Sequence, residues 1–196
     1  MLNAKSQKSR LLFWQRYLRR PLGVGAIVPS GSSLAEEMVK LLAPGVDDIV
    51  VEIGPGTGPF TRALLASGVA PSQLILIEFD AEFVLHLRQK FPGVTVVQGD
   101  ASELPRLLKE QGHDKVPKIL SGLPLRSMPE PVRAAITRAM ATSLAAQGSL
   151  VQFSYFLAPP LTQAEVKACG LTGHRAKTVM ANIPPAFVWH YSKSAA

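Results

Sequence analysis

Cysteine and long apolar runs are both scarce in this chain. Cys169 is the only cysteine among 196 residues, which excludes an internal disulfide and a zinc site built from several cysteines. A reducing cytoplasm is therefore the expected compartment. No apolar run reaches about 18 residues, the length at which a membrane-spanning helix is expected. Arginines interrupt the apolar residues near the N-terminus, so a signal peptide is not expected either.

Acidic residues are missing from the first 35 positions, and Glu36 is the first of them. The same segment carries six of the 21 basic residues, namely Lys5, Lys8, Arg10, Arg16, Arg19 and Arg20. The rest of the chain has 15 basic and 14 acidic residues and is nearly neutral. The net charge of +7 therefore lies mostly in this N-terminal segment, which we call the leader. A basic leader on a neutral body favours an anionic partner, either a lipid surface or a nucleic acid.

Residues 5–20 are predicted to form an amphipathic helix that Pro21 ends. At 100° per residue, most of its basic side chains share one side, whereas Phe13, Trp14, Tyr17 and their apolar neighbours share the other; Arg10 and Leu12 break the pattern. We expect residues 1–20 to bind anionic membrane, with Trp14 at the water interface. Two alternatives remain open, a helix packed on the core with a solvated charged face and a nucleic-acid arm, but the aromatic residues favour lipid.

Short apolar segments alternate with helical ones from residue 32 onward. Such alternation predicts an α/β fold in which helices cover both faces of an open parallel sheet, formed by residues 21–196 as one domain. Strands are predicted at 49–53, 73–78, 94–97, from 118, at 149–156, 176–180 and 186–191. Helices are predicted from Ser32 or Ser33 to 42, and at 59–67, 82–90, 131–145 and 162–168.

A glycine-rich turn follows the first predicted strand, with the sequence Glu52-Ile53-Gly54-Pro55-Gly56-Thr57-Gly58. Glycines at such a turn let the backbone approach a ligand, because they carry no Cβ. The spacing G-x-G-x-G differs from the dinucleotide fingerprint G-x-G-x-x-G, which would need glycine where Pro59 stands. Glu52 could organise a cationic amino-acid group, directly or through water.

Acidic residues also stand at the ends of the next two predicted strands. Glu78 lies 20 residues past Gly58, where an acid hydrogen-bonds ribose hydroxyls in folds of this kind. Asp100 could accept from an adenine amine while the Ala101 backbone meets a ring nitrogen. The glycine-rich turn, Glu78 and Asp100 are each a weak signal alone. Because all three stand at strand ends in this order, together they predict a nucleotide-type site. Phe79 and Ser30 complete the predicted cofactor-binding set, and no metal is expected.

These three motifs resemble the Rossmann-like S-adenosylmethionine-dependent methyltransferases, most strongly over residues 45–156. The resemblance implies a mostly parallel seven-stranded sheet, S-adenosylmethionine as cofactor and S-adenosylhomocysteine as product. The segment Ser121-Gly122-Leu123-Pro124-Leu125 stands where this superfamily faces the methyl group. Amine and adenine methyltransferases carry a loop like Asn-Leu-Pro-Tyr there; this chain keeps Leu123-Pro124 but has Gly122 for the Asn and Leu125 for the aromatic. Without that aromatic, no platform for stacking a nucleobase is expected.

Several further segments make the chain similar to the bacterial phospholipid N-methyltransferases, relatives of the rRNA adenine dimethyltransferases. These are Gly25–Ser30, Ser121–Leu125, Gln152–Tyr155 and Asn182–Ala186. The resemblance implies methylation of phosphatidylethanolamine, through its mono- and dimethyl forms, to phosphatidylcholine. The rRNA enzymes carry an additional C-terminal helical domain, whereas only about 40 residues follow the fifth predicted strand here, as expected for a lipid enzyme.

The expected catalytic set is therefore Ser121, Gly122, Leu123, Pro124 and Tyr155. Backbone carbonyls near Gly122 and Leu123 could orient the amine, and the Tyr155 ring could hold a methylated ammonium by a cation–π interaction; a core aromatic is the equal alternative. The expected location is the cytoplasmic face of the membrane, with neither nucleic acid nor an obligate protein partner. Two other functions stay open: an RNA adenine or soluble-amine N-methyltransferase, and a non-catalytic S-adenosylmethionine-binding protein that remodels membranes.

Overall fold

The computed structural model describes residues 30–182 and 184–193. The expected helix at 5–20 and the glycine-rich segment before Ser30 lie outside the described residues. Within the described ranges, no helix combines the length and the apolar character needed to cross a membrane.

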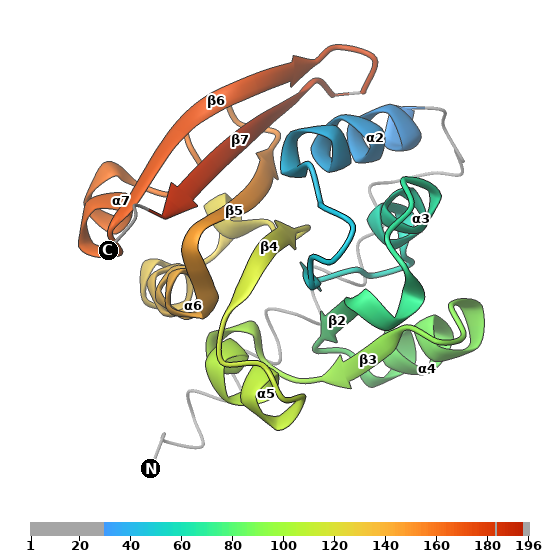
Figure 1. The fold of residues 1–196 in the computed structure, drawn as a ribbon. Coiled ribbons are helices and arrows are strands. Elements are labelled where there is room, and N and C mark those ends of the chain that lie inside the picture. Colours follow the sequence, from blue (N-terminus) through green and yellow to red (C-terminus); the bar gives the residue numbers. More distant parts are fainter. Residues whose placement is uncertain (1–29, 183, 194–196) are drawn as a thin grey trace.

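Seven strands form one sheet in the order β3-β2-β1-β4-β5-β7-β6 (Figure 1). They are β1 (Val50–Ile53), β2 (Leu74–Glu78), β3 (Thr95–Gln98), β4 (Val116–Ser121), β5 (Leu144–Ser154), β6 (Leu171–Val179) and β7 (Ala186–Lys193). The first five run parallel, and β7 pairs antiparallel with both β5 and β6. The strand order reverses between β1 and β4, the switch point beside which ligands of open α/β sheets bind. The predicted mostly parallel, seven-stranded sheet is confirmed.

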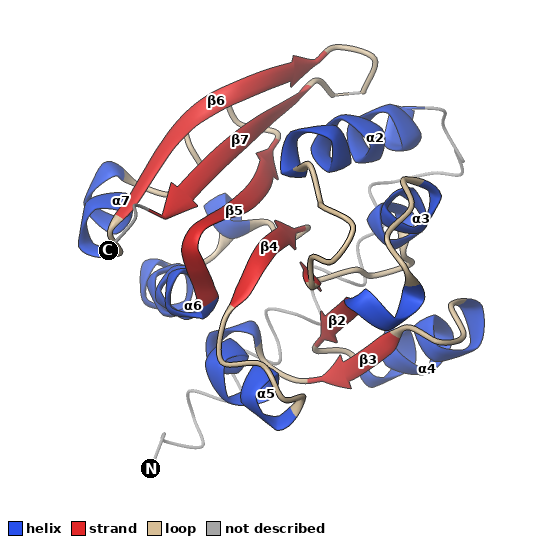
Figure 2. Cartoon of the chain, viewed as in Figure 1, coloured by secondary structure: helices blue, strands red, loops and turns tan. Residues whose placement is uncertain are grey.

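Helices cover both faces of this sheet (Figure 2). One face carries α2 (Ser30–Leu42), α3 (Pro59–Ala66) and α4 (Ala81–Lys90), and the other carries α5 (Leu104–Glu110), α6 (Glu130–Ser143) and α7 (Gln163–Ala168). Single 3-10 turns lie at Pro71–Gln73, Ala101–Glu103 and Leu125–Ser127. Arg133 of α6 and Glu165 of α7 form a mostly buried ion pair with a 2.9 Å contact, which joins these two helices.

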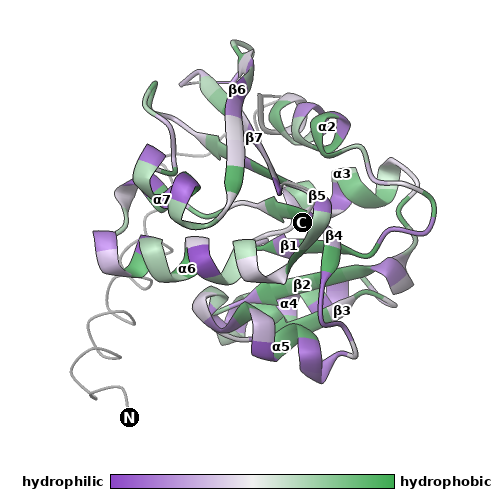
Figure 3. Cartoon of the chain, turned by 60° about the vertical axis from the view of Figure 1, so that its left-hand side comes forward, coloured by the Kyte–Doolittle hydropathy of each residue, from purple (hydrophilic) through white to green (hydrophobic). Residues whose placement is uncertain are grey.

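The two cores arise from the alternation of side chains along the strands. In β1, Val51 and Ile53 pack toward α5 and α6, whereas Val50 packs toward α2 and α3. The central strands are mostly hydrophobic, and the hydrophilic residues lie mainly on the helices and loops around them (Figure 3). Glu52 is fully buried on the Val50 side, so a carboxyl group occupies an otherwise apolar position.

Three elements differ from the sequence expectation. Helix α5 was not predicted, because its seven residues are too few to show a helical period. Strand β5 begins at Leu144, directly after α6, whereas the strand was predicted from residue 149. Gln147 within it has a φ of 60°, and no local sequence pattern indicates that conformation. Strand β6 begins at Leu171, five residues before its predicted start, because most of its side chains are exposed and give no apolar signal.

Gly58 caps α3 in a left-handed conformation with a φ of 80°. A Cβ at this position would lie 2.4 Å from Phe91 Cε2 and 2.8 Å from Phe91 Cζ. The buried Phe91 ring follows α4, so this glycine permits the close packing of α3 against α4. Gly68 is a natural comparison, because its φ is 101° but a Cβ there would meet nothing within 4 Å.

We therefore expect Gly58→Ala to destabilise the fold more than Gly68→Ala. Both variants carry the strain of a left-handed alanine, but only the first also overpacks a buried ring, which costs roughly 1–3 kcal/mol more. Urea unfolding of the two variants measures the difference. Equal losses would show that Phe91 moves aside freely and that the glycine is needed for its backbone alone.

Candidate functional site

The loops after β1, β3 and β4 meet at the carboxyl edge of the sheet. Each continues the pairing of its strand by one hydrogen bond: Gly54 N–H donates to the Ile77 carbonyl (3.0 Å), Gly99 N–H to that of Glu78 (2.9 Å) and Gly122 N–H to that of Ile53 (2.8 Å). These bonds fix the loops relative to one another. The candidate site is therefore held by the sheet itself.

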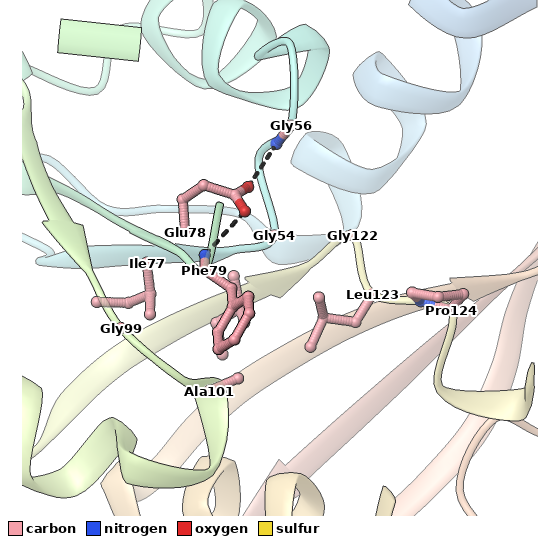
Figure 4. Close-up of a pocket in the computed structure, with 11 residues that line it drawn as sticks. Gly54, Gly56, Ile77, Glu78, Phe79, Gly99, Ala101, Gly122, Leu123 and Pro124 are labelled. Carbon is pink, nitrogen blue, oxygen red and sulfur yellow. Dashed lines mark hydrogen bonds between the residues drawn. The ribbon is translucent and has the colours of Figure 1, made fainter. Parts of the chain in front are cut away.

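A pocket opens between these loops, with an empty volume of about 490 Å³ that includes part of its open mouth. It is lined by Ile53, Gly54, Gly56, Ile77, Glu78, Phe79, Gly99, Ala101, Gly122, Leu123 and Pro124. Phe79 and Leu123 project into it from opposite sides, and Glu78 lies on the same side as Phe79 (Figure 4). Its side chains are apolar apart from one carboxylate, that of Glu78.

The Glu78 carboxylate organises this pocket. Its Oε2 accepts from the Gly56 N–H (3.0 Å), and its Oε1 accepts from the N–H groups of Phe79 (2.8 Å) and Asp80 (3.0 Å). Glu78 thus ties the glycine-rich loop to the end of β2. Burial raises its pKa, and the three backbone donors oppose that shift. A carboxylate offers about four acceptor positions, so one remains for a ligand hydroxyl.

Two glycines of the loop have different roles. Gly54 has a φ of 69°, and a Cβ there would lie 2.4 Å from Leu123 Cδ2, so it lets the loops after β1 and β4 approach. Gly56 has a φ of 55°, and a Cβ there would meet nothing within 4 Å. Gly56 therefore leaves open space at the pocket wall, as expected where backbone must lie against a ligand.

Several predicted site residues do not line this pocket. Gly58 packs on α4, and Ser121 is buried behind the loop, where its Oγ accepts a long 3.4 Å bond from the Leu123 N–H. Asp100 begins the turn Ala101–Glu103, where its Oδ1 accepts from the Ser102 N–H and hydroxyl. Glu52 is fully buried in β1 and has no surface in the pocket. Predicted residue Ser30 begins α2, and nothing of its side chain is described.

Glu52 is an unusual buried acid. Its Oε2 accepts from Thr61 Oγ1 of α3 at 2.7 Å, whereas its Oε1 has no hydrogen-bond partner within the described part of the chain. Burial, helped slightly by the nearby Glu78, raises the pKa of this group from 4.5 to about 8, although the Thr61 bonds oppose the shift. A cation brought close to it would favour the ionised form.

A second pocket adjoins the first across Pro124, which lines both. Its empty volume is about 310 Å³, and its walls come from the loop after β4 and the end of β5: Pro124, Leu125, Arg126, Ser127, Phe153, Ser154, Tyr155 and Phe156. Predicted residue Tyr155 is half-buried here and meets Phe153 edge-on, with ring centroids 5.3 Å apart. Phe153 in turn contacts Phe60 of α3 at 5.7 Å.

Gln152 holds the wall between the pockets and was not predicted as a site residue. It is fully buried in β5, and its Nε2 donates to the Leu123 carbonyl at 2.8 Å and to the Phe153 carbonyl at 2.8 Å. An amide inside an otherwise apolar strand was the available signal. Arg126 and Phe156 were also missed, because exposed residues in a loop carry no periodic pattern.

The absence of asparagine at position 122 also has a structural reason. A Cβ on Gly122 would lie 2.8 Å from the Gly54 carbonyl oxygen and 3.4 Å from the Phe60 ring. The loops after β1 and β4 are too close for a side chain there. In this chain the loop therefore presents backbone, and no amide side chain, between the two pockets.

The fold is that of a Rossmann-like α/β protein, with a pocket at its switch point. The sequence model for the methyltransferase domain matches residues 50–148, about half of the chain, and the chain belongs to this family. It is a class I methyltransferase, and S-adenosylmethionine is its cofactor.

Curated relatives fall into two groups. The ornithine lipid N-methyltransferase of Singulisphaera acidiphila is 29% identical over 151 residues, which cover 75% of this chain and 78% of that protein. The ribosomal RNA small subunit methyltransferase A of Methylococcus capsulatus is 37% identical over 95 residues, which cover 47% of this chain but only 32% of that protein.

Solved structures share the fold at low identity. A TehB-like S-adenosylmethionine-dependent methyltransferase from Corynebacterium glutamicum superposes with a TM-score of 0.62 at 17% identity, over 98% of this chain and 100% of that one. The magnesium protoporphyrin IX methyltransferase of Synechocystis, solved with bound S-adenosylmethionine, gives 0.63 at 17% identity, over 92% and 91%. At this identity the likeness concerns the fold.

The residues of the first pocket fit S-adenosylmethionine. The cofactor is cationic, and Glu78 is an acidic side chain in the wall of this pocket. The open space at Gly56 would let the loop backbone lie against the cofactor. The apolar side chains of Ile77, Phe79 and Ala101 would hold the adenine. Glu78 would accept from the ribose hydroxyls.

We expect Glu78→Gln to weaken the binding of S-adenosylmethionine by about tenfold or more. An amide in this place would turn an NH₂ toward backbone N–H donors, and it would lose a charge-assisted bond to ribose. Calorimetric titration with S-adenosylmethionine measures the effect. Glu82→Gln, at an exposed position of α4, is the matched control. Unchanged affinity in a folded Glu78→Gln variant would reject the ribose assignment.

The buried Glu52 should make stability depend on pH. Because its pKa is raised in the folded state, folding takes up a proton, and the stability of the wild type should fall as pH rises from about 4.5 to about 8. The contribution of this group is at most about 1.4 kcal/mol per pH unit.

Glu52→Gln should therefore gain stability relative to wild type between pH 5 and pH 8.5, as measured by urea unfolding at both values. Glu36→Gln, on the exposed side of α2, should differ from wild type by the same amount at both. A constant difference for Glu52→Gln as well would mean that Glu52 is ionised in the folded protein throughout.

Proposed function

We propose that this protein methylates the amine of a lipid headgroup, with phosphatidylethanolamine and its mono- and dimethyl forms as substrates. The observation that carries the proposal is the second pocket, which adjoins the cofactor pocket and is open, apolar and lined by aromatic residues. The similarity to an ornithine lipid N-methyltransferase over 75% of the chain supports it. Both lipids present a primary amine on a short polar headgroup.

The chemistry requires little from acidic or basic side chains. Bound S-adenosylmethionine would supply a methyl group on a positively charged sulfur, and its transfer to a neutral amine would leave S-adenosylhomocysteine and an ammonium, which loses a proton to solvent where the nitrogen still carries a hydrogen. The main contribution of the protein is then to position the amine and to exclude water. The loop Gly122–Pro124 lies between the two pockets and is the natural place for this positioning.

We assign the orientation of the amine to the backbone of this loop. The Leu123 carbonyl already accepts from Gln152, which fixes the loop, so the Gly122 carbonyl is our first candidate for accepting an amine N–H. The face of the Tyr155 ring would hold the partly methylated ammonium, a contact worth roughly 0.5–2 kcal/mol. Residues 1–20 would bring the protein to an anionic membrane through their basic, amphipathic pattern.

A nucleobase is a poorer fit to the second pocket. Leu125 is 1% exposed and packs in the core, so it offers no ring on which a base could stack. The ribosomal RNA relatives also match less than half of this chain. We therefore keep RNA as an outcome of the test and do not propose it.

Incubation of the protein with methyl-labelled S-adenosylmethionine tests the proposal. We expect label to enter the lipid fraction with vesicles of phosphatidylethanolamine and phosphatidylglycerol, and not to enter RNA offered separately. Vesicles of phosphatidylcholine and phosphatidylglycerol, whose headgroups carry no methylatable amine, are the control. Label in RNA and none in any lipid would overturn the proposal, and label in neither, with intact cofactor binding, would favour a non-catalytic role.

A further inference from the structure

Arg126 is the only charged residue among those that line the second pocket. It lies in the turn Leu125–Ser127, two positions after the wall shared with the cofactor pocket. Its side chain is exposed and has no acidic or hydrogen-bonding partner within residues 30–182 and 184–193. A free guanidinium at the mouth of an apolar pocket favours an anionic group on the ligand.

Four other arginines of the described chain have partners, whereas Arg62 and Arg138 are exposed and line neither pocket. Arg106 is paired with Glu103 and Glu110, Arg133 with Glu165, and the Arg88 guanidinium donates to the Val96 carbonyl. Arg175 lies over the Phe187 ring. Arg126 differs in that its charge is left available beside a cavity.

Exposed apolar side chains lie near the end of β5, which forms one wall of this pocket. Phe156 is 54% exposed and Leu157 is 66% exposed, directly after β5. Met180 is 71% exposed and follows β6. Strand β7 lies between β5 and β6. The ends of the three strands are level, because Ser154 of β5 pairs with Phe187 of β7, and Ala186 of β7 pairs with Val179 of β6. Met180 is therefore about two strand spacings, roughly 10 Å, from the end of β5. Exposed large apolar side chains at one edge indicate contact with an apolar partner.

We propose that Arg126 binds the anionic group of a zwitterionic lipid headgroup and so places its amine at the Gly122–Pro124 loop. This inference rests on the proposed function. In phosphatidylethanolamine the anion is a phosphate, and in ornithine lipid it is a carboxylate. In both, a short carbon chain separates it from the amine, which suits the short step from Arg126 to Pro124. Phe156, Leu157 and Met180 would meet the acyl chains where they leave the pocket.

A single cation also argues against a nucleic-acid track at this place. Nucleic-acid backbones present a phosphate at every nucleotide and are bound by several basic side chains together. Here one arginine stands among apolar and hydroxyl-bearing residues. One cation beside exposed apolar side chains matches one headgroup on acyl chains.

Arg126→Gln tests the assignment, with Arg126→Lys as the conservative variant and Arg138→Gln as the matched control. Arg138 is exposed on α6 and does not line either pocket. Three acceptors are compared in neutral detergent micelles: phosphatidylethanolamine, ornithine lipid, and a long-chain primary alkylamine that lacks any anion. The affinity of each variant for S-adenosylmethionine is measured separately.

We expect Arg126→Gln to raise KM for the zwitterionic acceptors by about tenfold, because one charge-assisted contact is lost, with kcat changed by less than about threefold. Arg126→Lys should recover part of the loss. The alkylamine and the cofactor affinity should be unaffected, and Arg138→Gln should behave as wild type throughout. If KM rises more for phosphatidylethanolamine than for ornithine lipid, the site takes a phosphate. The reverse result means that it takes a carboxylate.

Two failures are distinguishable. If the wild type methylates no lipid amine, the proposed function fails, and this inference fails with it. If the wild type is active but Arg126→Gln matches Arg138→Gln, the proposed function stands and the anion site is wrong. Equal losses on the alkylamine and the zwitterionic lipids would also overturn it, because the arginine would then act on the shape of the loop.

Discussion

Backbone packs against backbone where the loops after β1 and β4 meet, and both pockets depend on this contact. The Gly122 N–H donates to the Ile53 carbonyl, and a Cβ on Gly122 would lie 2.8 Å from the Gly54 oxygen. Two glycines thus allow one thin wall, Leu123-Pro124, to separate the cofactor pocket from the second pocket. Gln152 fixes that wall from behind by its bond to the Leu123 carbonyl. A rigid loop at this place would hold the two ligands in a fixed relation while leaving the amine free to reach the methyl group.

Charge is distributed around this wall in a way that suits both proposed ligands. Two buried acids, Glu52 and Glu78, lie on the cofactor side, where a cation is expected. One unpaired arginine, Arg126, lies on the acceptor side, where the proposed headgroup carries an anion. The acids are costly to bury, and Glu52 holds its proton more tightly in consequence. A bound cation nearby would offset part of that cost by favouring the ionised form.

Much of this arrangement was predictable from the sequence. Strands β1 to β3 are short apolar segments followed by glycine or an acid, and their parallel pairing brings those ends to one edge whatever the details of packing. Gly54, Gly56, Glu78, Phe79 and Ala101 therefore line one pocket, as expected from their positions. Asp100, at the same edge, turns its Oδ1 to Ser102 instead, a local choice that strand position does not reveal.

The sequence by itself determined the fold and the edge of the sheet at which the first pocket opens. Periodicity and glycine spacing are local properties that can be recognised directly in the sequence. Only the tertiary structure decided that Gly58 serves packing, that Glu52 lies buried against Thr61, and that Arg126 and Phe156 share a cavity with Tyr155. These outcomes depend on contacts between elements distant in sequence. Gln152 shows the limit most clearly: its polar side chain was visible in an apolar strand, but its partner, the Leu123 carbonyl, lies 29 positions away and is fixed by strand pairing.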